Sequence, residues 1–192
     1  MLGEIKKIIE DNKYGFIRCG DGKEYYFNAD SLVGDISFGD LATGMEIEFD
    51  IVMGENRKLR AVNCKIIENE NVKFFKESVL DLHTNKKQYD IFCDKAREYA
   101  ERLKTGKVTT SMIRKVYARV LNASTVTDIK LLRPHFAYIS GRNEKNYVLR
   151  EFMDLLDYLA KELEMDNMQQ LENYKQFLEA IVAYRKYVGK DK

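Results

Sequence analysis

The sequence predicts an α+β protein built from two parts, a small five-stranded β-barrel followed by an all-α helical bundle. In the first third of the chain, short segments alternate apolar and polar residues and are separated by glycine-containing turns, as in strands that bury one face. In the rest, apolar residues recur every three or four positions, as in helices that bury one face. A chain of 192 residues is long enough for one large domain or for two small ones, each with its own core. Hydrophobic residues make up 45% and there is a single proline, so we expect no long disordered tail. The predicted boundaries are 1–68 for the barrel, 69–104 for a connecting helix or helices, and 105–192 for the bundle.

Five segments carry the strand pattern of the predicted barrel. They are Gly3–Ile9, Tyr14–Arg18, Glu24–Ala29, Met45–Met53 and Leu59–Ile67. The turn Cys19–Gly22 contains Asp-Gly, which supplies the positive φ that a tight hairpin needs. Five short strands in so short a sequence are typical of a small barrel.

Residues 69–104 show helical spacing of apolar residues in two stretches, Asn71–Leu82 and Tyr89–Lys104. Residues 83–85 interrupt this spacing, so the segment is either two helices or one long helix with a kink. In both cases the apolar face is wide enough to pack, and we expect no flexible tether between the two parts.

Four further helices are predicted in residues 105–192. They are Val108–Leu121, Ile129–Ser140, Tyr147–Leu163 and Leu171–Val188. One of residues 109–111 caps the first, and Asp128 is a candidate cap for the second. Pro134 has to lie in a first turn or force a bend, because its ring blocks an interior helical hydrogen bond. Gly141 is the expected C-cap that follows this helix.

The charge balance excludes a protein that coats nucleic acid indiscriminately. Lysine and arginine total 32 against 31 acidic residues, a formal net charge of +1. Any contact with nucleic acid therefore has to come from local patches or from a surface completed by partners.

The cysteines and the N-terminal segment point to a reducing cytoplasm. Cys19, Cys64 and Cys93 are odd in number, far apart and not in a CxxC pair, and residues 1–11 lack the charged and apolar regions of a signal peptide. No apolar run approaches the roughly 20 residues needed to span a bilayer, so no membrane partner is expected.

No catalytic residue, metal site or cofactor is predicted. The two histidines, His83 and His135, lie far apart, whereas a zinc site needs clustered ligands. The sequence contains no phosphate-binding loop of the GxxxxGK[ST] kind and no recognisable serine–histidine–acid motif. We therefore expect a protein that is not an enzyme.

The predicted barrel resembles a cold-shock domain. The resemblance lies in Gly3–Lys6, Lys13–Ile17, Tyr25–Leu32, Leu41–Phe49 and Ala61–Asn63, which follow the family's order and include its two RNA-binding motifs. It implies an OB-type barrel on which exposed aromatic residues stack unpaired bases.

The stacking surface that this resemblance implies is incomplete. Lys7 stands at the family's tryptophan position, Asn28 at its histidine position and Ala29 at the phenylalanine that follows. The candidate RNA-binding residues of the barrel are Lys7, Lys13, Tyr14, Phe16, Arg18, Tyr26 and Asn28. The alternative is a barrel retained for protein contacts, with its aromatic residues partly buried.

The helical part resembles the small subunit of type III-A CRISPR effector complexes, the Csm small subunit. Three stretches carry the resemblance, Thr109–Lys115, Leu132–Arg142 and Phe177–Tyr187, and it extends over about Tyr89–Gly189. Members of this family normally consist of the helical bundle alone, so the role of the barrel cannot be taken from the family.

This resemblance implies a non-catalytic subunit that stacks inside a ribonucleoprotein beside the paired guide and target RNAs. Its implied partners are the two RNAs, the large subunit, the backbone subunits and other copies of itself. The candidate RNA-backbone contacts are Arg114, Lys115, Arg119, Arg133, Arg142, Arg185 and Lys186, which lie on or beside the three matching stretches. Arginine guanidinium groups bind phosphate oxygens without reading sequence. Each of these cations taken singly is better explained as an ordinary surface charge, whereas the set together favours contact with the RNA backbone.

Two other functions remain open on sequence grounds. The first is a free-standing cold-shock-type protein that binds single-stranded nucleic acid as an RNA chaperone or regulator, with helices that dimerise. The second is a structural adaptor whose barrel binds protein.

Overall fold

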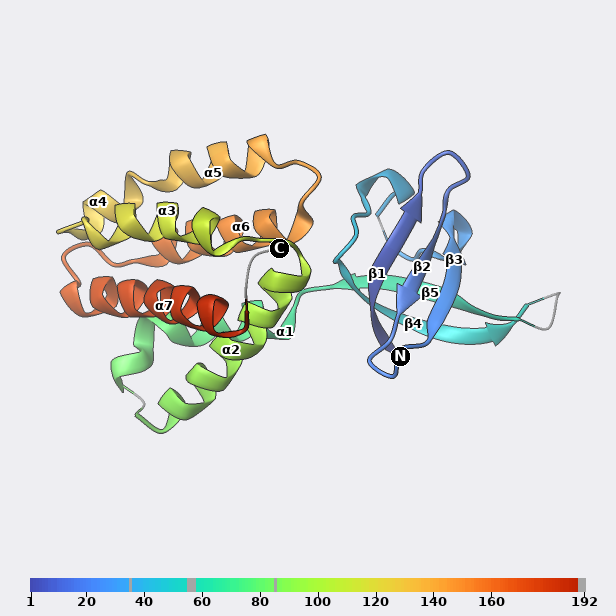
Figure 1. Cartoon of the computed structure of the whole chain (residues 1–192), viewed down its shortest axis with the longest axis horizontal. Coiled ribbons are helices and arrows are strands. Elements are labelled where there is room, and N and C mark those ends of the chain that lie inside the picture. The colour runs from blue at the N-terminus through green and yellow to red at the C-terminus, as the bar shows by residue number, and fades with distance from the viewer. Residues whose placement is uncertain (35, 55–57, 85, 190–192) are drawn as a thin grey trace. The chain divides into compact units, whose positions relative to one another are not determined.

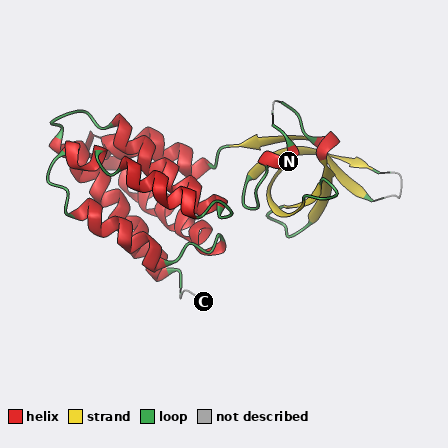
Figure 2. Ribbon diagram, turned by 90° about the horizontal axis from the view of Figure 1, so that it is seen from above, coloured by secondary structure: helices red, strands yellow, loops and turns green. Residues whose placement is uncertain are grey.

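The computed structural model describes residues 1–34, 36–54, 58–84 and 86–189. The chain divides into two compact units, Met1–Asn69 and Glu70–Lys192. The first is a closed β-barrel and the second is helical, as the colours of Figure 2 show. The predicted α+β fold class is confirmed.

The barrel consists of five strands that pair in the order β1-β2-β3-β5-β4 and close on themselves (Figure 1). Their bounds are β1 Leu2–Ile9, β2 Tyr14–Arg18, β3 Glu24–Asn28, β4 Glu46–Met53 and β5 Leu59–Ile67. Neighbours are antiparallel except for β3 and β5, which pair in parallel. All five predicted strands are confirmed, with ends that differ by at most one residue.

Alternation along the strands places every second side chain inside the barrel. The buried core residues are Ile5, Ile17, Cys19, Tyr25, Phe27, Phe38, Leu41, Ile47, Phe49, Ala61 and Cys64. Gly15 allows β2 to lie against this core, because a Cβ there would come within 2.6 Å of the Phe27 ring. In the hairpin turn after β2, Gly22 has a φ of 81° and its N–H donates to the Cys19 carbonyl at 2.9 Å, as the Asp-Gly pair predicts.

The second unit contains seven α-helices within its described residues. Their bounds are α1 Glu70–Ser78, α2 Tyr89–Thr105, α3 Thr110–Leu121, α4 Val126–Lys130, α5 Arg133–Arg142, α6 Tyr147–Glu162 and α7 Met168–Tyr187. Short 3₁₀ segments, Val79–Thr84 and Lys86–Gln88, connect α1 to α2.

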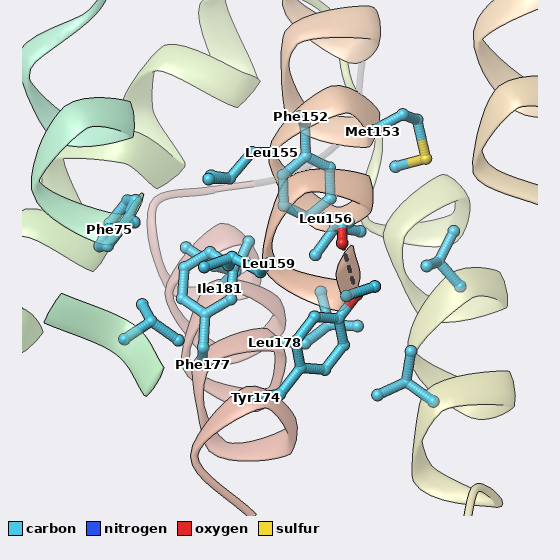
Figure 3. Packing of buried hydrophobic residues seen from close by; sticks show 14 of the residues in the cluster. Phe75, Phe152, Met153, Leu155, Leu156, Leu159, Tyr174, Phe177, Leu178 and Ile181 are labelled. Atoms are coloured by element: carbon cyan, nitrogen blue, oxygen red, sulfur yellow. Dashed lines mark hydrogen bonds between the residues drawn. The ribbon is translucent and has the colours of Figure 1, made fainter. Parts of the chain in front are cut away.

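The core of the helical unit forms where the apolar faces of α6 and α7 meet the other helices. Phe152, Leu156 and Leu159 from α6 interleave with Tyr174, Phe177, Leu178 and Ile181 from α7 (Figure 3). The fully buried Tyr174 hydroxyl donates to the Leu156 carbonyl at 3.1 Å, which satisfies the one polar group that this ring brings inside. The sequence predicts both helices as long amphipathic segments. In the structure they lie at the centre of the bundle.

The segment expected to connect the two parts contributes directly to this core. Its buried apolar residues include Val72, Phe75, Val79, Leu82, Phe92, Ala96, Tyr99 and Leu103. The interruption predicted near residues 83–85 is the 3₁₀ segment Val79–Thr84, in which Asp81 leaves the helical conformation. Asn85 lies outside the described residues.

The predicted helix Ile129–Ser140 is two helices. The chain leaves α4 after Lys130, and α5 begins at Arg133 with Pro134 in its first turn, where the missing N–H costs no helical hydrogen bond. The expectation that Gly141 ends this helix is wrong, since Gly141 lies inside α5 and Asn143 follows the last helical residue.

The helix caps are partly as predicted. Thr109 caps α3, and its hydroxyl accepts from the Met112 N–H at 3.2 Å. Thr125 rather than Asp128 caps α4. Asp128 instead closes a capping box, accepting from the Thr125 N–H at 2.8 Å.

Candidate nucleic-acid interface

Helix α3 presents opposite faces to the core and to solvent. Ile113, Val116 and Val120 are fully buried, and α3 packs on α7. Arg114, Lys115 and Arg119 are exposed, as the helical spacing of the sequence predicts.

A shallow hollow of about 410 Å³ lies where α3 meets the last turns of α7. We call it the α3–α7 hollow. Its lining residues are Thr110, Ser111, Arg114, Lys115, Ala118 and Lys186. Lys186 is far from the others in sequence, and the fold brings it beside the two cations of α3.

A second depression of about 370 Å³ runs along the other flank of α3, between α3 and α5. We call it the α3–α5 groove. Its lining residues are Met112, Lys115, His135, Tyr138, Ile139, Arg142, Asn143 and Leu149. Lys115 lines both depressions, so its side chain lies between the two.

Five of the seven predicted cations of the bundle share this surface. They are Arg114, Lys115, Arg119, Arg142 and Lys186, which we call the α3 basic surface. Arg119 belongs to it because it is exposed one turn after Lys115 on the same face of α3, and its charge also lowers the pKa of the His135 imidazole. Burial is the larger cause of the lowered pKa, so His135 is neutral at pH 7.

The charges of the α3 basic surface are not neutralised by the protein. Among residues 1–34, 36–54, 58–84 and 86–189, none of its five cations forms an ion pair. Arg142 lies over the Tyr138 ring, 5.7 Å from its centroid, and donates to the Tyr138 hydroxyl at 3.2 Å. The surface is therefore suited to an anionic ligand.

Arg133 lies apart from this surface and has a partner. Its Nε and a terminal nitrogen donate to the two carboxylate oxygens of Asp157 at 2.9 and 3.0 Å. The bond to Asp157 raises the pKa of Arg133 further, and its charge is offset locally. A phosphate at this position would have to compete with Asp157.

The prediction that Arg185 contacts RNA needs correction, because its side chain points into the protein. Arg185 is 2% exposed, and its Nε donates to the Val108 carbonyl at 2.8 Å. A terminal nitrogen donates to the Gly189 carbonyl at 3.0 Å. Consecutive helical residues point about 100° apart, so Lys186 faces solvent while Arg185 ties the end of α7 to the loop before α3.

The aromatic candidates of the barrel form one cluster on its outer surface. The ring centroids of Tyr14, Phe16 and Tyr26 lie 5.6–6.2 Å apart. Tyr26 is exposed and the other two rings are half-buried, so the cluster faces solvent. The sequence could not establish this orientation.

The other candidate RNA-binding residues of the barrel differ in exposure and in their contacts. Lys7 and Lys13 are exposed, whereas Arg18 lies 3.4 Å from Glu24, to which Lys6 also donates. The Asn28 side-chain oxygen accepts a hydrogen bond from the Ser31 hydroxyl at 2.8 Å. This bond stabilises the turn after β3.

Arg60 joins this site although no motif or spacing in the sequence selects it. Strand register pairs Lys7 with Phe16, Phe16 with Tyr26, and Tyr26 with the exposed Arg60. Partners in register share a face, so the four side chains form a row across β1, β2, β3 and β5. The pairing of β3 with β5 spans more than 30 residues of chain, and no local pattern signals it.

The remaining chemical groups add no site. Within the described residues, no group of three or more His, Cys, Asp and Glu side chains could hold a metal ion. Cys19 and Cys64 are buried and Cys93 is half-buried, all as free thiols, and burial raises the pKa of Cys64 to about 11. None of the described helices is both long and apolar enough to cross a membrane.

Comparison with known families identifies the helical part. The family model for Csm2 Type III-A matches residues 86–191, more than half of the chain. A comparison with curated proteins gives no match. The matched region contains α2 to α7 and therefore the whole α3 basic surface. The chain thus belongs to the Csm2 family of type III-A CRISPR-Cas small subunits.

Proposed function

We propose that this small subunit is non-catalytic and that its α3 basic surface contacts the phosphate backbone of the guide or target RNA in a type III-A effector complex. The observation that carries the proposal is the gathering of five cations from α3, α5 and α7 within the matched region, none of them ion-paired in the described part of the chain. Large and backbone subunits and further copies of the chain are its proposed protein partners, in the cytoplasm.

The physical basis is electrostatic. Lys115 and Arg119 are four residues apart on one helix, so their charges repel each other in the free protein. A polyanion along α3 removes this repulsion and releases its own condensed counterions. Contacts of this kind are independent of sequence, as a subunit that meets many different guides requires.

Replacing Arg114, Lys115 and Lys186 together by alanine should weaken binding to a single-stranded RNA oligonucleotide at least tenfold near 0.1 M salt. The slope of log affinity against log salt should become shallower by about 0.7 for each phosphate that the variant no longer binds. Fluorescence anisotropy across a salt series measures both quantities.

The matched control removes one arginine and two lysines elsewhere. Lys73, Arg97 and Lys161 are exposed and lie on α1, α2 and α6, outside the α3–α7 hollow and the α3–α5 groove. If this control weakens RNA binding as much as the first variant does, net charge rather than the α3 basic surface is responsible.

For the barrel we propose contact with single-stranded RNA. The support is the solvent-facing aromatic cluster, which lies between Lys7 on one side and Arg60 on the other. Stacking a base on such a ring contributes about 1–3 kcal/mol.

Tyr26→Ala is expected to weaken binding of the same oligonucleotide by about 5- to 150-fold, which corresponds to one base that no longer stacks. Tyr158→Ala is the control, because Tyr158 and Tyr26 are both 38% exposed and Tyr158 lies in the helical unit. Equal affinities for the two variants would favour a protein ligand for the barrel.

Assembly is tested by isolating the tagged chain from its host. Recovery of effector subunits and repeat-derived guide RNA supports the proposal. Recovery of mixed cellular transcripts alone would instead favour a free-standing protein that binds single strands through its barrel.

A further inference from the structure

The α3–α5 groove differs in chemistry from the hollow on the other side of α3. Its walls are mainly apolar, formed by Met112 of α3, Ile139 of α5 and the buried Leu149 of α6. Tyr138 is 58% exposed on its rim. A volume of about 370 Å³ is within the range of roughly 300–1,000 Å³ that is usual for small-molecule sites.

The mouth of this groove is cationic. Lys115 and Arg142 line it from opposite helices, and none of its eight lining residues is acidic. Arg142 lies over the Tyr138 ring, so the guanidinium and the phenol form an adjoining pair. An apolar groove with two cations at its mouth is complementary to a ligand that has a flat apolar group attached to an anionic group.

Apart from these two cations, the polar groups at the groove are few and uncharged. Asn143 donates its amide to the Ile139 carbonyl at 2.8 Å, and its side-chain oxygen has no partner in the described chain. The His135 imidazole lines the same groove in its neutral form and offers one donor and one acceptor. The edge of each of the four bases carries both donors and acceptors, so any base can meet these groups, whereas a phosphate carries acceptors only.

We propose that the α3–α5 groove binds one unstacked nucleobase of the RNA whose phosphates the α3 basic surface holds. The proposal rests on the proposed RNA contact and adds a base to what would otherwise be a contact with the backbone alone. Lys115 holds a phosphate between the hollow and the groove, and the base beside that phosphate enters against Tyr138. Recognition through stacking accepts any base, so the groove fixes the position of the RNA without selecting its sequence.

The test compares two RNAs on two forms of the full-length chain. One RNA is an ordinary single-stranded oligonucleotide, and the other has the same length and phosphates with abasic sugars throughout. Tyr138→Ala should weaken binding of the ordinary RNA about tenfold and change binding of the abasic RNA less than twofold. Every protein form in this comparison also carries Tyr26→Ala, because an oligonucleotide held by the barrel alone would conceal a loss at the groove. Tyr138→Phe keeps the ring and should bind both RNAs as the form with an intact Tyr138 does.

The outcomes separate this proposal from the one on which it rests. An equal effect of Tyr138→Ala on both RNAs, or no effect on either, overturns the base site. The variant lacking Arg114, Lys115 and Lys186 should lose affinity for both RNAs, and failure to do so would overturn the backbone contact itself. If Tyr138→Ala leaves both affinities unchanged but reduces recovery of neighbouring subunits from the host, the groove holds a protein side chain and the base site is wrong.

Discussion

Replacing Phe75 with alanine should lower the free energy of unfolding of the helical unit by about 3–5 kcal/mol, the usual cost of removing a large buried ring. Phe75 lies on α1 and is fully buried. Its ring centroid lies 4.9 Å from that of Phe177 and 5.7 Å from that of Tyr99, so the substitution leaves a cavity between α1, α2 and α7.

Urea unfolding followed by the helical circular dichroism of the full chain measures this destabilisation. Ile91→Ala is the control, because Ile91 is 50% exposed on α2 and should cost less than about 0.5 kcal/mol. A small effect of Phe75→Ala would mean that the bundle is stable without α1. The family match begins at residue 86, so a fragment cut there would lack Phe75 and the other buried core residues of the preceding segment, and we expect it to fold poorly.

Replacing Glu151 with alanine should destabilise the helical unit by a similar amount, about 3–5 kcal/mol. The Glu151 carboxylate accepts from two nitrogens of Arg102 at 2.8 and 2.9 Å, and both side chains are only 8% exposed. The Tyr99 hydroxyl also donates to it, at 3.2 Å. Without the carboxylate, the largely buried Arg102 guanidinium loses two hydrogen bonds and the buried Tyr99 hydroxyl loses one.

The double variant Arg102→Met, Glu151→Leu distinguishes the cost of breaking the ion pair from one side from the contribution of the pair itself. Replacing a buried ion pair with apolar residues of similar size is often neutral or stabilising. We therefore expect the double variant to be much more stable than Glu151→Ala. If the two unfold at the same urea concentration, the ion pair itself stabilises the fold.

The strands were predictable because each buries a single face, and a single buried face requires apolar and polar residues to alternate along the sequence. The division between α4 and α5 was harder to predict from the sequence. Apolar spacing continues through Leu131 and Leu132, and only Pro134 signals that a new helix has begun. The prediction that Gly141 ends the helix is wrong because glycine often follows a helix, whereas here the chain remains helical through Gly141.

The candidate site was predictable only where one helix carries it. The exposed face of α3 follows from helical spacing, and Arg114, Lys115 and Arg119 lie as that spacing predicts. The contribution of Lys186, the burial of Arg185 and the position of Arg60 depend on packing between segments distant in sequence. Local pattern carries no information about such packing.

For the RNA contact proposed for the barrel, the row formed by Lys7, Phe16, Tyr26 and Arg60 sets the expected length of RNA covered. Neighbouring strands lie about 4.8 Å apart, so the three steps from β1 to β5 extend over roughly 14 Å. An RNA strand that follows this row crosses the β-strands and does not run along them. Its footprint should therefore lie near the lower end of the roughly 4–16 nucleotides typical of barrels of this kind, leaving adjacent nucleotides free for other subunits.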